Sequence, residues 1–304
     1  MSAIEQEIAS QPALWRLAAG LGAAGEHLPP SGARVAAIGC GTSRYMAEAY
    51  AAAREDAGVG ETDAFAASET PGGRRYDAVL AISRSGTTSE VVAALSALPP
   101  GVPTHAVVGV AGTPIARAVD RAVVLDFADE ASVVQTRFAT TALVYLLVSL
   151  GLDVERAAAD AERALAADLP VTPGAGGGFV FLGRRWTVGV AAEAALKLRE
   201  AALQWAESYP ALEYRHGPIA LADDGTVVWP FGDVEADLLD DVRETGAAVV
   251  ESDLHPLAQL VLVQRTAVAL AKARSLDPNR PRNLTRSVVL QEMTNRNPRK
   301  VVRS

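Results

Sequence analysis

The sequence contains a single cysteine, Cys40, among its 304 residues. One thiol cannot form a disulfide within the chain, and no Cys-x-x-Cys pair is present to bind a metal or to carry out redox chemistry. We therefore expect a protein of the reducing cytoplasm. Cys40 is flanked by glycines, but the sequence offers no evident histidine partner for it, so a small buried thiol is the favoured interpretation over a nucleophile.

An excess of basic residues is also missing, since 28 Lys and Arg stand against 36 Asp and Glu. Nucleic acid binding needs a concentrated basic surface, so we do not expect a nucleic acid partner. The longest apolar run, 139–152, falls short of the roughly 20 residues that span a bilayer and predicts a buried helix. Residues 1–11 are polar and acidic and lack the apolar stretch of a secretory signal. We expect no membrane association.

Several sequence patterns of well-known sites are absent. The four histidines include no H-x-x-x-H or H-E-x-x-H pair, so we expect no metal. The G-x-S-x-G elbow of serine hydrolases is absent too. The turn GCG at 39–41 begins like a dinucleotide-binding fingerprint, but Arg44 stands where its third glycine would be. We therefore expect no cofactor.

What the chain does contain is an alternation of short apolar strands and helical segments. Strand patterns begin with RVAAIG and recur at 62–69, 76–83, 104–111 and 121–128, which is typical of a parallel sheet with helices on both faces. After a Pro/Gly-rich break the pattern restarts, and ARVAAIGCGTS aligns with GGFVFLGRRWT. The sequence predicts an α/β protein of two tandem, doubly wound, flavodoxin-like domains.

These patterns also predict where the domains begin and end. The expected divisions are an N-terminal helical segment, a first domain, a linker, a second domain and a tail, at 1–30, 31–167, 168–178, 179–287 and 288–304.

The stretch AISRSGTTSEVV, at 81–92, places five hydroxyl side chains around Gly86. One interpretation is helix capping, because Thr87 and Glu90 have the spacing of a capping box. However, Ser83 and Ser85 precede that cap, and a glycine-centred turn at a helix start gathers N–H donors for an anion. We favour a phosphate site. The corresponding loop of the second half, WPFGD, has no hydroxyl and carries an acid, so we expect one phosphate site, in the first half.

A second cluster lies in the helical pattern EAALKLREAALQ. Glu193, Lys197, Glu200 and Gln204 recur every three or four residues, which predicts that they share one helix face. Such spacing is also typical of solvated ion pairs. His216 follows in a turn bounded by Gly and Pro, where an imidazole can transfer protons near neutral pH. A structural capping histidine is the alternative.

Six stretches taken in order, GCGTS, ISRSGTTSEV, SVVQTR, EAALKLRE, EYRHGP and DPNRPRNLTRSV, resemble the double sugar isomerase domain family. This family includes the isomerase half of glucosamine-6-phosphate synthase, fructosamine-6-phosphate deglycases and tagatose-6-phosphate ketose/aldose isomerases. The resemblance extends from residue 8 to about residue 288. It implies a phosphorylated sugar as the ligand.

The resemblance also implies which residues bind that sugar. They come from four separate segments: Gly41, Thr42, Ser43, Ser83, Arg84, Ser85, Gly86, Thr88, Gln135 and Arg286. The implied phosphate ligands are the hydroxyls of Ser83, Ser85 and Thr88, with backbone help from Arg84 and Gly86.

Three further residues are implied to be catalytic. Glu200 matches the carboxylate that moves a proton between C1 and C2, Lys197 the nearby ammonium, and His216 the imidazole linked to ring opening. In relatives the neighbouring subunit can supply this histidine, which implies a homodimer. Arg286 departs from the synthase pattern, which has a lysine there, and arginine cannot form an imine.

The expected reaction is removal of the C2 proton from an open-chain amino hexose 6-phosphate, without a cofactor. Reprotonation at C1 gives a ketose, and a C2 amine then allows deamination. An alternative is C3 elimination from an N-acetylated amino sugar 6-phosphate, such as N-acetylglucosamine 6-phosphate. An alternative of another class is a non-catalytic, phosphosugar-sensing regulator, which would have no need of Glu200 and His216.

Overall fold

The computed structural model describes residues 1–22, 25, 27–171 and 177–290. It contains two sheets in which every strand pair is parallel. The first sheet has the order β2-β1-β3-β4-β5 and the second β7-β6-β8-β9. The strands are β1 Val35–Gly39, β2 Thr62–Ala66, β3 Ala78–Ser83, β4 Thr104–Val108, β5 Arg121–Val124, β6 Phe179–Gly183, β7 Ala206–Pro210, β8 Val227–Phe231 and β9 Ala248–Val249. The predicted α/β class with parallel sheets is confirmed.

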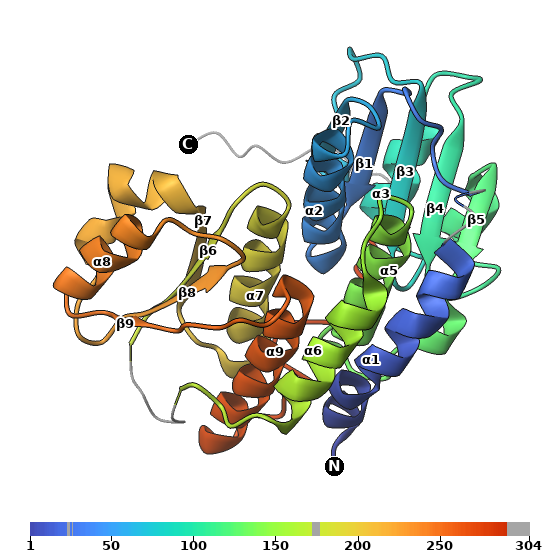
Figure 1. Ribbon diagram of the computed structural model, residues 1–304. Coiled ribbons are helices and arrows are strands. Elements are labelled where there is room, and N and C mark those ends of the chain that lie inside the picture. Colours follow the sequence, from blue (N-terminus) through green and yellow to red (C-terminus); the bar gives the residue numbers. More distant parts are fainter. Residues whose placement is uncertain (23–24, 26, 172–176, 291–304) are drawn as a thin grey trace, which may run out of the picture.

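Several helices lie between the two sheets (Figure 1). The α-helices are α1 Ala3–Gly22, α2 Thr42–Asp56, α3 Ser89–Ser96, α4 Pro114–Ala118, α5 Arg137–Val148, α6 Val154–Ala166, α7 Thr187–Ala202, α8 Ala236–Glu244 and α9 Pro256–Ala273. Short 3-10 turns are η1 Ala67–Glu69, η2 Asp126–Ala128, η3 Ala211–His216 and η4 Pro218–Leu221. The apolar run that predicted a buried helix forms most of α5, and residues 138–147 of that helix are buried.

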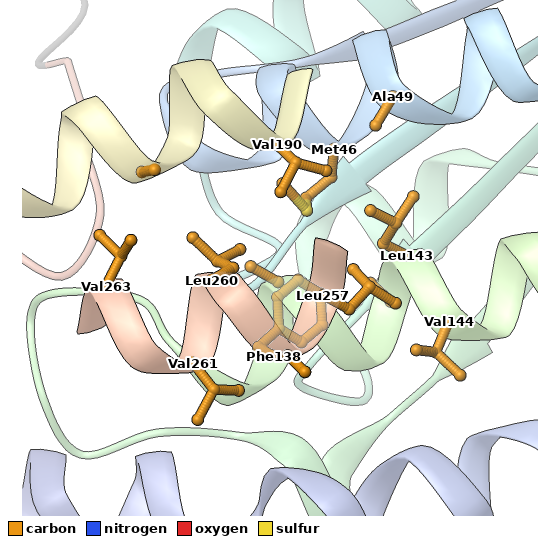
Figure 2. Packing of buried hydrophobic residues seen from close by; sticks show 14 of the residues in the cluster. Met46, Ala49, Phe138, Leu143, Val144, Val190, Leu257, Leu260, Val261 and Val263 are labelled. Atoms are coloured by element: carbon orange, nitrogen blue, oxygen red, sulfur yellow. The ribbon is translucent and has the colours of Figure 1, made fainter. Parts of the chain in front are cut away.

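The largest cluster of buried apolar side chains joins the two halves of the chain. Met46 of α2 and Leu143 of α5 belong to the same cluster as Val190 of α7 and Leu260 of α9 (Figure 2). Gly189 allows the close approach of α7 to α2, because a Cβ atom there would lie 2.5 Å from the carbonyl oxygen of Tyr45. The two helices therefore pack directly against each other between the sheets.

The second sheet repeats the strand arrangement of the first, since β7-β6-β8-β9 corresponds to β2-β1-β3-β4. The turns after β1 and β6 also match. A Cβ atom on Gly39 would lie 2.6 Å from the carbonyl carbon of Ser43, and one on Gly183 would lie 2.4 Å from the carbonyl oxygen of Thr187. In both halves the strand therefore ends in a glycine because the first helical turn packs onto it.

Three of the predicted divisions lie partly outside the described residues. Positions 23–24 and 26 of the N-terminal segment, 172–176 of the linker and 291–304 of the tail are not described, and the domain boundaries stay predictions. Among the described residues, no helix combines the length and hydropathy that crossing a bilayer requires.

Candidate functional site

The hydroxyl-rich loop connects β3 to α3. The capping interpretation of this loop is wrong: the helix begins at Ser89, its N-cap is Thr88, and no side chain caps it. The Thr87 hydroxyl instead donates to Ser85 Oγ at 3.1 Å. The amide of Gly86 donates to Ser83 Oγ at 3.1 Å, which closes the turn. The hydroxyls therefore gather on the loop itself and leave the helix end to other partners.

The C-terminal segment 286–290 lies against this loop. Ser287 Oγ is 3.0 Å from Ser85 Oγ and 2.9 Å from Thr87 Oγ1. The Ser89 amide, at the start of α3, donates to the carbonyl of Val288 at 3.2 Å. In return, the Leu290 amide donates to Ser89 Oγ at 2.9 Å. Sequence reasoning missed this contact, although the stretch NLTRSV had marked the segment as part of the family pattern.

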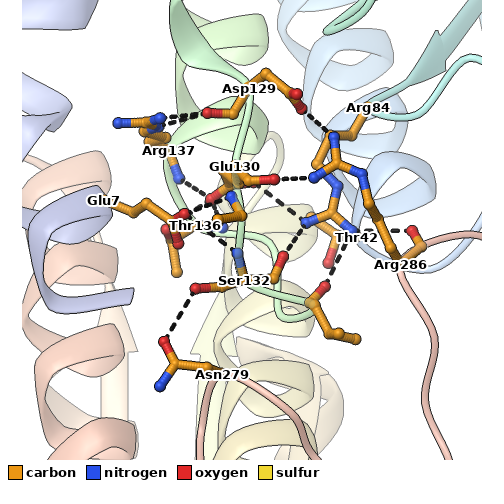
Figure 3. A network of polar contacts seen from close by, with 12 residues as sticks. Glu7, Thr42, Arg84, Asp129, Glu130, Ser132, Thr136, Arg137, Asn279 and Arg286 are labelled. Carbon is orange, nitrogen blue, oxygen red and sulfur yellow. Dashed lines mark hydrogen bonds and ion pairs between the residues drawn. The ribbon is translucent and has the colours of Figure 1, made fainter. Parts of the chain in front are cut away.

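Arg84 has a buried side chain that connects three segments (Figure 3). Its guanidinium donates to the carbonyls of Ser132 at 2.8 Å, Val133 at 3.0 Å and Arg286 at 2.9 Å. Burial lowers the pKa of Arg84 and raises that of Glu130, whose carboxylate lies 3.6 Å away. The backbone of Arg84, not its charge, is thus left to face a ligand in the loop.

The same network fixes the segment that carries Gln135. The Glu130 carboxylate accepts from the backbone amide and the hydroxyl of Thr136, and Glu7 of α1 accepts from the Ser132 amide at 3.2 Å. Gln135 Oε1 is buried and has no hydrogen-bond partner among the described residues. Because buried polar atoms are normally partnered, this oxygen is available to accept a hydrogen bond from a ligand hydroxyl.

Arg286 is held by acidic and carbonyl groups of the neighbouring loop. Its guanidinium pairs with Asp129 and donates to the carbonyl oxygen of Glu130 (Figure 3). About a third of each charged side chain is exposed. The charge of Arg286 is therefore already paired in this structure.

Helix α7 brings the predicted acid–base residues together. Lys197 Nζ lies 2.6 Å from Glu200 Oε2 and 3.2 Å from Glu193 Oε1. It also donates to the Thr42 hydroxyl at 3.0 Å, although Thr42 is 155 positions away. Lys197 and Glu193 are at most 1% exposed at their side chains, whereas the Glu200 side chain is 21% exposed. Glu200 is thus the carboxylate that solvent, or a ligand, can reach.

The prediction of a shared helix face is right for three of its four members. Glu193, Lys197 and Glu200 lie on α7, but the helix ends at Ala202 because Leu203 turns into the left-handed conformation with φ 51°. Gln204 is therefore outside the helix and hydrogen-bonds to Gly177 and Arg274 instead.

The charges on α7 shift one another's pKa values. Burial raises the pKa of Glu193 to about 7, against the opposing effect of Lys197. Burial alone would lower the pKa of Lys197, but the carboxylates of Glu193 and Glu200 raise it above its ordinary value. Lys197 is therefore an ammonium at neutral pH and not a base. Its spacing of four from Lys197 predicted that Glu193 lies on this helix face, but the sequence indicated no role for Glu193.

The remaining predicted residues fall into two groups. Thr42 and Ser43 are buried in the first turn of α2, after Gly41 with its φ of 54°. His216 is exposed at the end of η3, and among the described contacts none joins it to Lys197 or Glu200. Cys40 is half-buried, and this burial raises its pKa, which disfavours a thiolate nucleophile.

Known sequences show what the chain is similar to. No family model matches it. It is 30% identical over 306 positions to the isomerizing glutamine–fructose-6-phosphate aminotransferase of Methanothermobacter thermautotrophicus, with 85% of the chain covered. The same enzyme of Methanosarcina acetivorans is 29% identical over 319 positions. The chain spans about half the length of these curated relatives, 52% and 51%.

Solved structures extend this similarity to the whole described fold. A glucosamine-6-phosphate deaminase from Thermotoga maritima matches with a TM-score of 0.83 and 25% identity, covering 95% of this chain and all of that one. The C-terminal domain of the Francisella tularensis glucosamine-fructose-6-phosphate aminotransferase matches at 0.80, with 20% identity and coverage of 92% and 98%. The resemblance to the double sugar isomerase domain family is confirmed. In this double sugar isomerase fold, Thr42, Lys197 and Glu200 meet where the first half contacts α7.

Proposed function

We propose that the protein is an enzyme that acts on phosphorylated amino sugars. In this proposal it removes the C2 proton of an open-chain amino hexose 6-phosphate without a cofactor, and it produces a ketose and, from a free C2 amine, ammonia. The observation that carries the proposal is the Lys197 ammonium held between the carboxylates of Glu193 and Glu200 beside Thr42. The names of the similar proteins, a deaminase and an isomerizing aminotransferase, support the substrate class.

The first chemical step is proton abstraction. The aldehyde at C1 acidifies the C2 proton, and Glu200 takes it, which leaves an enolate with negative charge on O1. This enolate is an enediolate when C2 carries a hydroxyl and an enolamine when C2 carries an amine. The neighbouring ammonium of Lys197 stabilises that charge, because a preorganised cation in a partly buried site needs no reorganisation during the reaction. The protonated Glu200 then returns a proton to C1.

The second step depends on the substituent at C2. With a hydroxyl, protonation at C1 and transfer of the O2 proton to O1 complete an aldose–ketose isomerisation. With a free amine, protonation at C1 and transfer of one N–H proton to O1 give a C2 imine. Addition of one water molecule to this imine then releases ammonia and leaves the ketose. The same base thus serves both outcomes, and the substrate decides between them.

The phosphate is proposed to bind the loop between β3 and α3. Ser83, Ser85 and Thr88 supply hydroxyl donors, and the backbone amide of Arg84 adds to them near the positive end of α3. The Gly86 amide, which donates to Ser83 Oγ in this structure, would exchange that partner for the phosphate. The sugar hydroxyls would then contact Thr42, Ser43 and the unpartnered oxygen of Gln135. In this arrangement the Ser287 hydroxyl, which touches Ser85, gives way or joins the phosphate contacts.

A homodimer is part of this proposal, because His216 would come from the neighbouring subunit. The exposure of His216 supports it. Exposed large apolar side chains also accumulate in the segment around this histidine: Leu203, Trp205, Leu212 and Leu221. The cores of homodimer interfaces are usually rich in such apolar side chains. We further propose two tandem domains with the predicted boundaries, and a cytoplasmic location.

The proposal is tested with a panel of free and N-acetylated amino sugar 6-phosphates. Ammonia, ketose and ultraviolet absorbance are followed together in each reaction. Ketose with ammonia from the free amines supports the proposal. Absorbance alone, from an N-acetylated substrate, would show C3 elimination instead. Binding of the panel without any product would identify a phosphosugar sensor.

A further inference from the structure

The carboxyl edge of the second sheet contains a crevice that the proposed function does not use. In open α/β sheets ligands bind where neighbouring strands send their connections in opposite directions, which in the order β7-β6-β8-β9 lies between β6 and β8. A cavity of about 570 Å³ occupies this place. Its walls come from the β6–α7 turn, the β8–α8 loop and the start of α9. It is the counterpart of the site between β1 and β3.

One buried side chain that lines this cavity has an acceptor atom without a partner among the described residues. Gln259 is 2% exposed, and its Nε2 donates to the carbonyl of Leu254 at 3.0 Å, which fixes the orientation of the amide. The Oε1 atom is then left with no hydrogen bond among the described residues. A buried acceptor without a donor costs free energy. A hydroxyl or amine of a ligand in the cavity would provide that donor.

Three arginines line the rim of the cavity, of which two are paired with acids. Arg184 pairs with Glu235, and Arg185 pairs with Asp56 at 2.5 Å. Arg156 lines the same cavity, is exposed, and has no ion pair within the described part of the chain. Its guanidinium is therefore free to bind an anionic group.

Trp186 and His255 also line the cavity, and both rings are uncharged at neutral pH. The ring of Trp186 lies 6.0 Å from that of His255, centroid to centroid. Burial lowers the pKa of His255 to about 4, and the nearby charge of Arg156 acts in the same direction. A neutral histidine beside an indole offers an apolar surface to the C–H face of a polyhydroxylated ligand.

The backbone at this place differs from its counterpart in one respect. Gly41 has φ 54° in the turn after β1, and the matching position after β6 is Arg185 with φ 50°. A side chain in the left-handed region costs roughly 1–2 kcal/mol that glycine avoids. The second turn thus keeps an arginine at the rim despite this cost.

We infer that this crevice is a second binding site, which takes a hydroxylated organic anion. Arg156 binds the anionic group, Gln259 Oε1 accepts from a ligand hydroxyl, and Trp186 packs against the carbon skeleton. The β8–α8 loop has no hydroxyl donors and carries Asp233, so the anion binds at the Arg156 rim and not in that loop. Along α7 the site is about 20 Å from Glu200, at 1.5 Å per helical residue. The inference does not depend on the proposed reaction.

The test is a calorimetric titration of the whole chain with four probes: 6-phosphogluconate, gluconate, inorganic phosphate and glucose. 6-Phosphogluconate has no C1 aldehyde and is not turned over, and we expect it to bind at two sites per chain. Arg156→Gln should weaken only the second site, by tenfold or more, and Gln259→Leu should weaken it as well. Arg75→Gln is the matched control, because Arg75 is also exposed and without an ion pair among the described residues. It should change neither site.

The probes separate the ligand's features. Binding of gluconate but not glucose at the second site shows that an anionic group is needed, and failure of inorganic phosphate shows that hydroxyls are needed. Arg156 is exposed, so its variant is expected to fold. A single site per chain that Arg156→Gln leaves unchanged and Ser85→Ala removes would overturn the inference and leave the proposed function intact. A single site removed by Arg156→Gln alone would instead contradict the phosphate loop.

Discussion

The turns after β1 and β6 follow similar backbone paths but present different chemistry. Both begin at a glycine, Gly39 or Gly183, onto which the first helical turn packs. The first turn then offers the small polar side chains of Thr42 and Ser43, whereas the second offers Arg184, Arg185 and Trp186. The constraint that is repeated is therefore the close approach of strand and helix. The residues after the glycine are free to differ, and they decide what each half can bind.

The pairing of α2 with α7 connects these two turns. The start of α2 contacts the last part of α7, where Thr42 meets Lys197, and the end of α2 contacts the start of α7, where Asp56 meets Arg185. The first contact is buried and contains a lysine between two carboxylates. The second is a solvated ion pair, with the Arg185 side chain 70% exposed. Burial thus distinguishes the proposed catalytic end from the opposite end.

The largest effect is expected from Glu200→Gln, which keeps the shape of the side chain and removes its basicity. Turnover of amino sugar phosphates should fall by about 10² or more. The loss should be in kcat, with phosphosugar binding retained. Steady-state kinetics and calorimetry on the same preparation measure the two quantities.

The control for this variant is Glu244→Gln, at the exposed end of α8 in the second half. It should leave kcat unchanged. Turnover by Glu200→Gln at the wild-type rate would show that Glu200 is not the base. The buried end of α7 would then have no catalytic role that distinguishes it from the exposed end.

The next effect concerns Gly39 and Gly183, the glycines at equivalent strand ends in the two halves. Gly39→Ala and Gly183→Ala each force a Cβ atom against helix backbone, so both should lower the free energy of unfolding by about 1–3 kcal/mol. Denaturant unfolding measures this. Gly20→Ala in α1 is the control, because no atom lies within 4 Å of the added Cβ, and it should gain roughly 0.5–1 kcal/mol. A loss at only one of the two strand ends would show that the turns are not equivalent.

Much of this repeated framework could be predicted from the sequence, because strand patterns and terminal glycines are local signals. The apolar runs predicted the parallel strands. The alignment of GCGTS with GRRWT identified two equivalent turns, each of which follows a strand in the structure. The predicted helix extended too far, to Gln204, because no sequence pattern indicates that Leu203 adopts a left-handed conformation.

The tertiary parts of the site could not be predicted in the same way. The contact of Thr42 with Lys197 joins residues 155 positions apart, and the position of Ser287 on the hydroxyl loop depends on how the C-terminal segment crosses the first half. The buried Arg84–Glu130 ion pair could not be predicted either, because charged residues are usually exposed. The alternation of residue types contains no information on such contacts.

A smaller effect is expected in the hydroxyl loop, which the second half lacks. Ser85→Ala and Thr88→Ala should each weaken phosphosugar binding by about tenfold, because each removes a donor to a charged group. The fold should change little, since neither hydroxyl lies in a core cluster. Calorimetry with 6-phosphogluconate, which is not turned over, measures the affinity at the first site. Unchanged affinity there in both variants would mean that the phosphate binds elsewhere.

A further effect is a pH dependence of stability at the buried end of α7. Glu193 has its pKa raised to about 7, above the ordinary value of 4.5. Its contribution to stability is therefore fully present below about pH 4.5 and is lost as the pH rises through 7. Glu193→Gln should remove this contribution. The difference in unfolding free energy between variant and wild type should shift in favour of the variant across that range, and a constant difference would contradict the raised pKa.

The most direct measurement follows the C2 hydrogen itself. Glucosamine 6-phosphate deuterated at C2 is incubated with the wild type and with Glu200→Gln, and the label is located by NMR. Our account predicts that the wild type moves the deuteron from C2 to C1 of the ketose or to solvent, while Glu200→Gln leaves it at C2. Loss of the C2 label from the Glu200→Gln variant at the wild-type rate would contradict proton abstraction by Glu200.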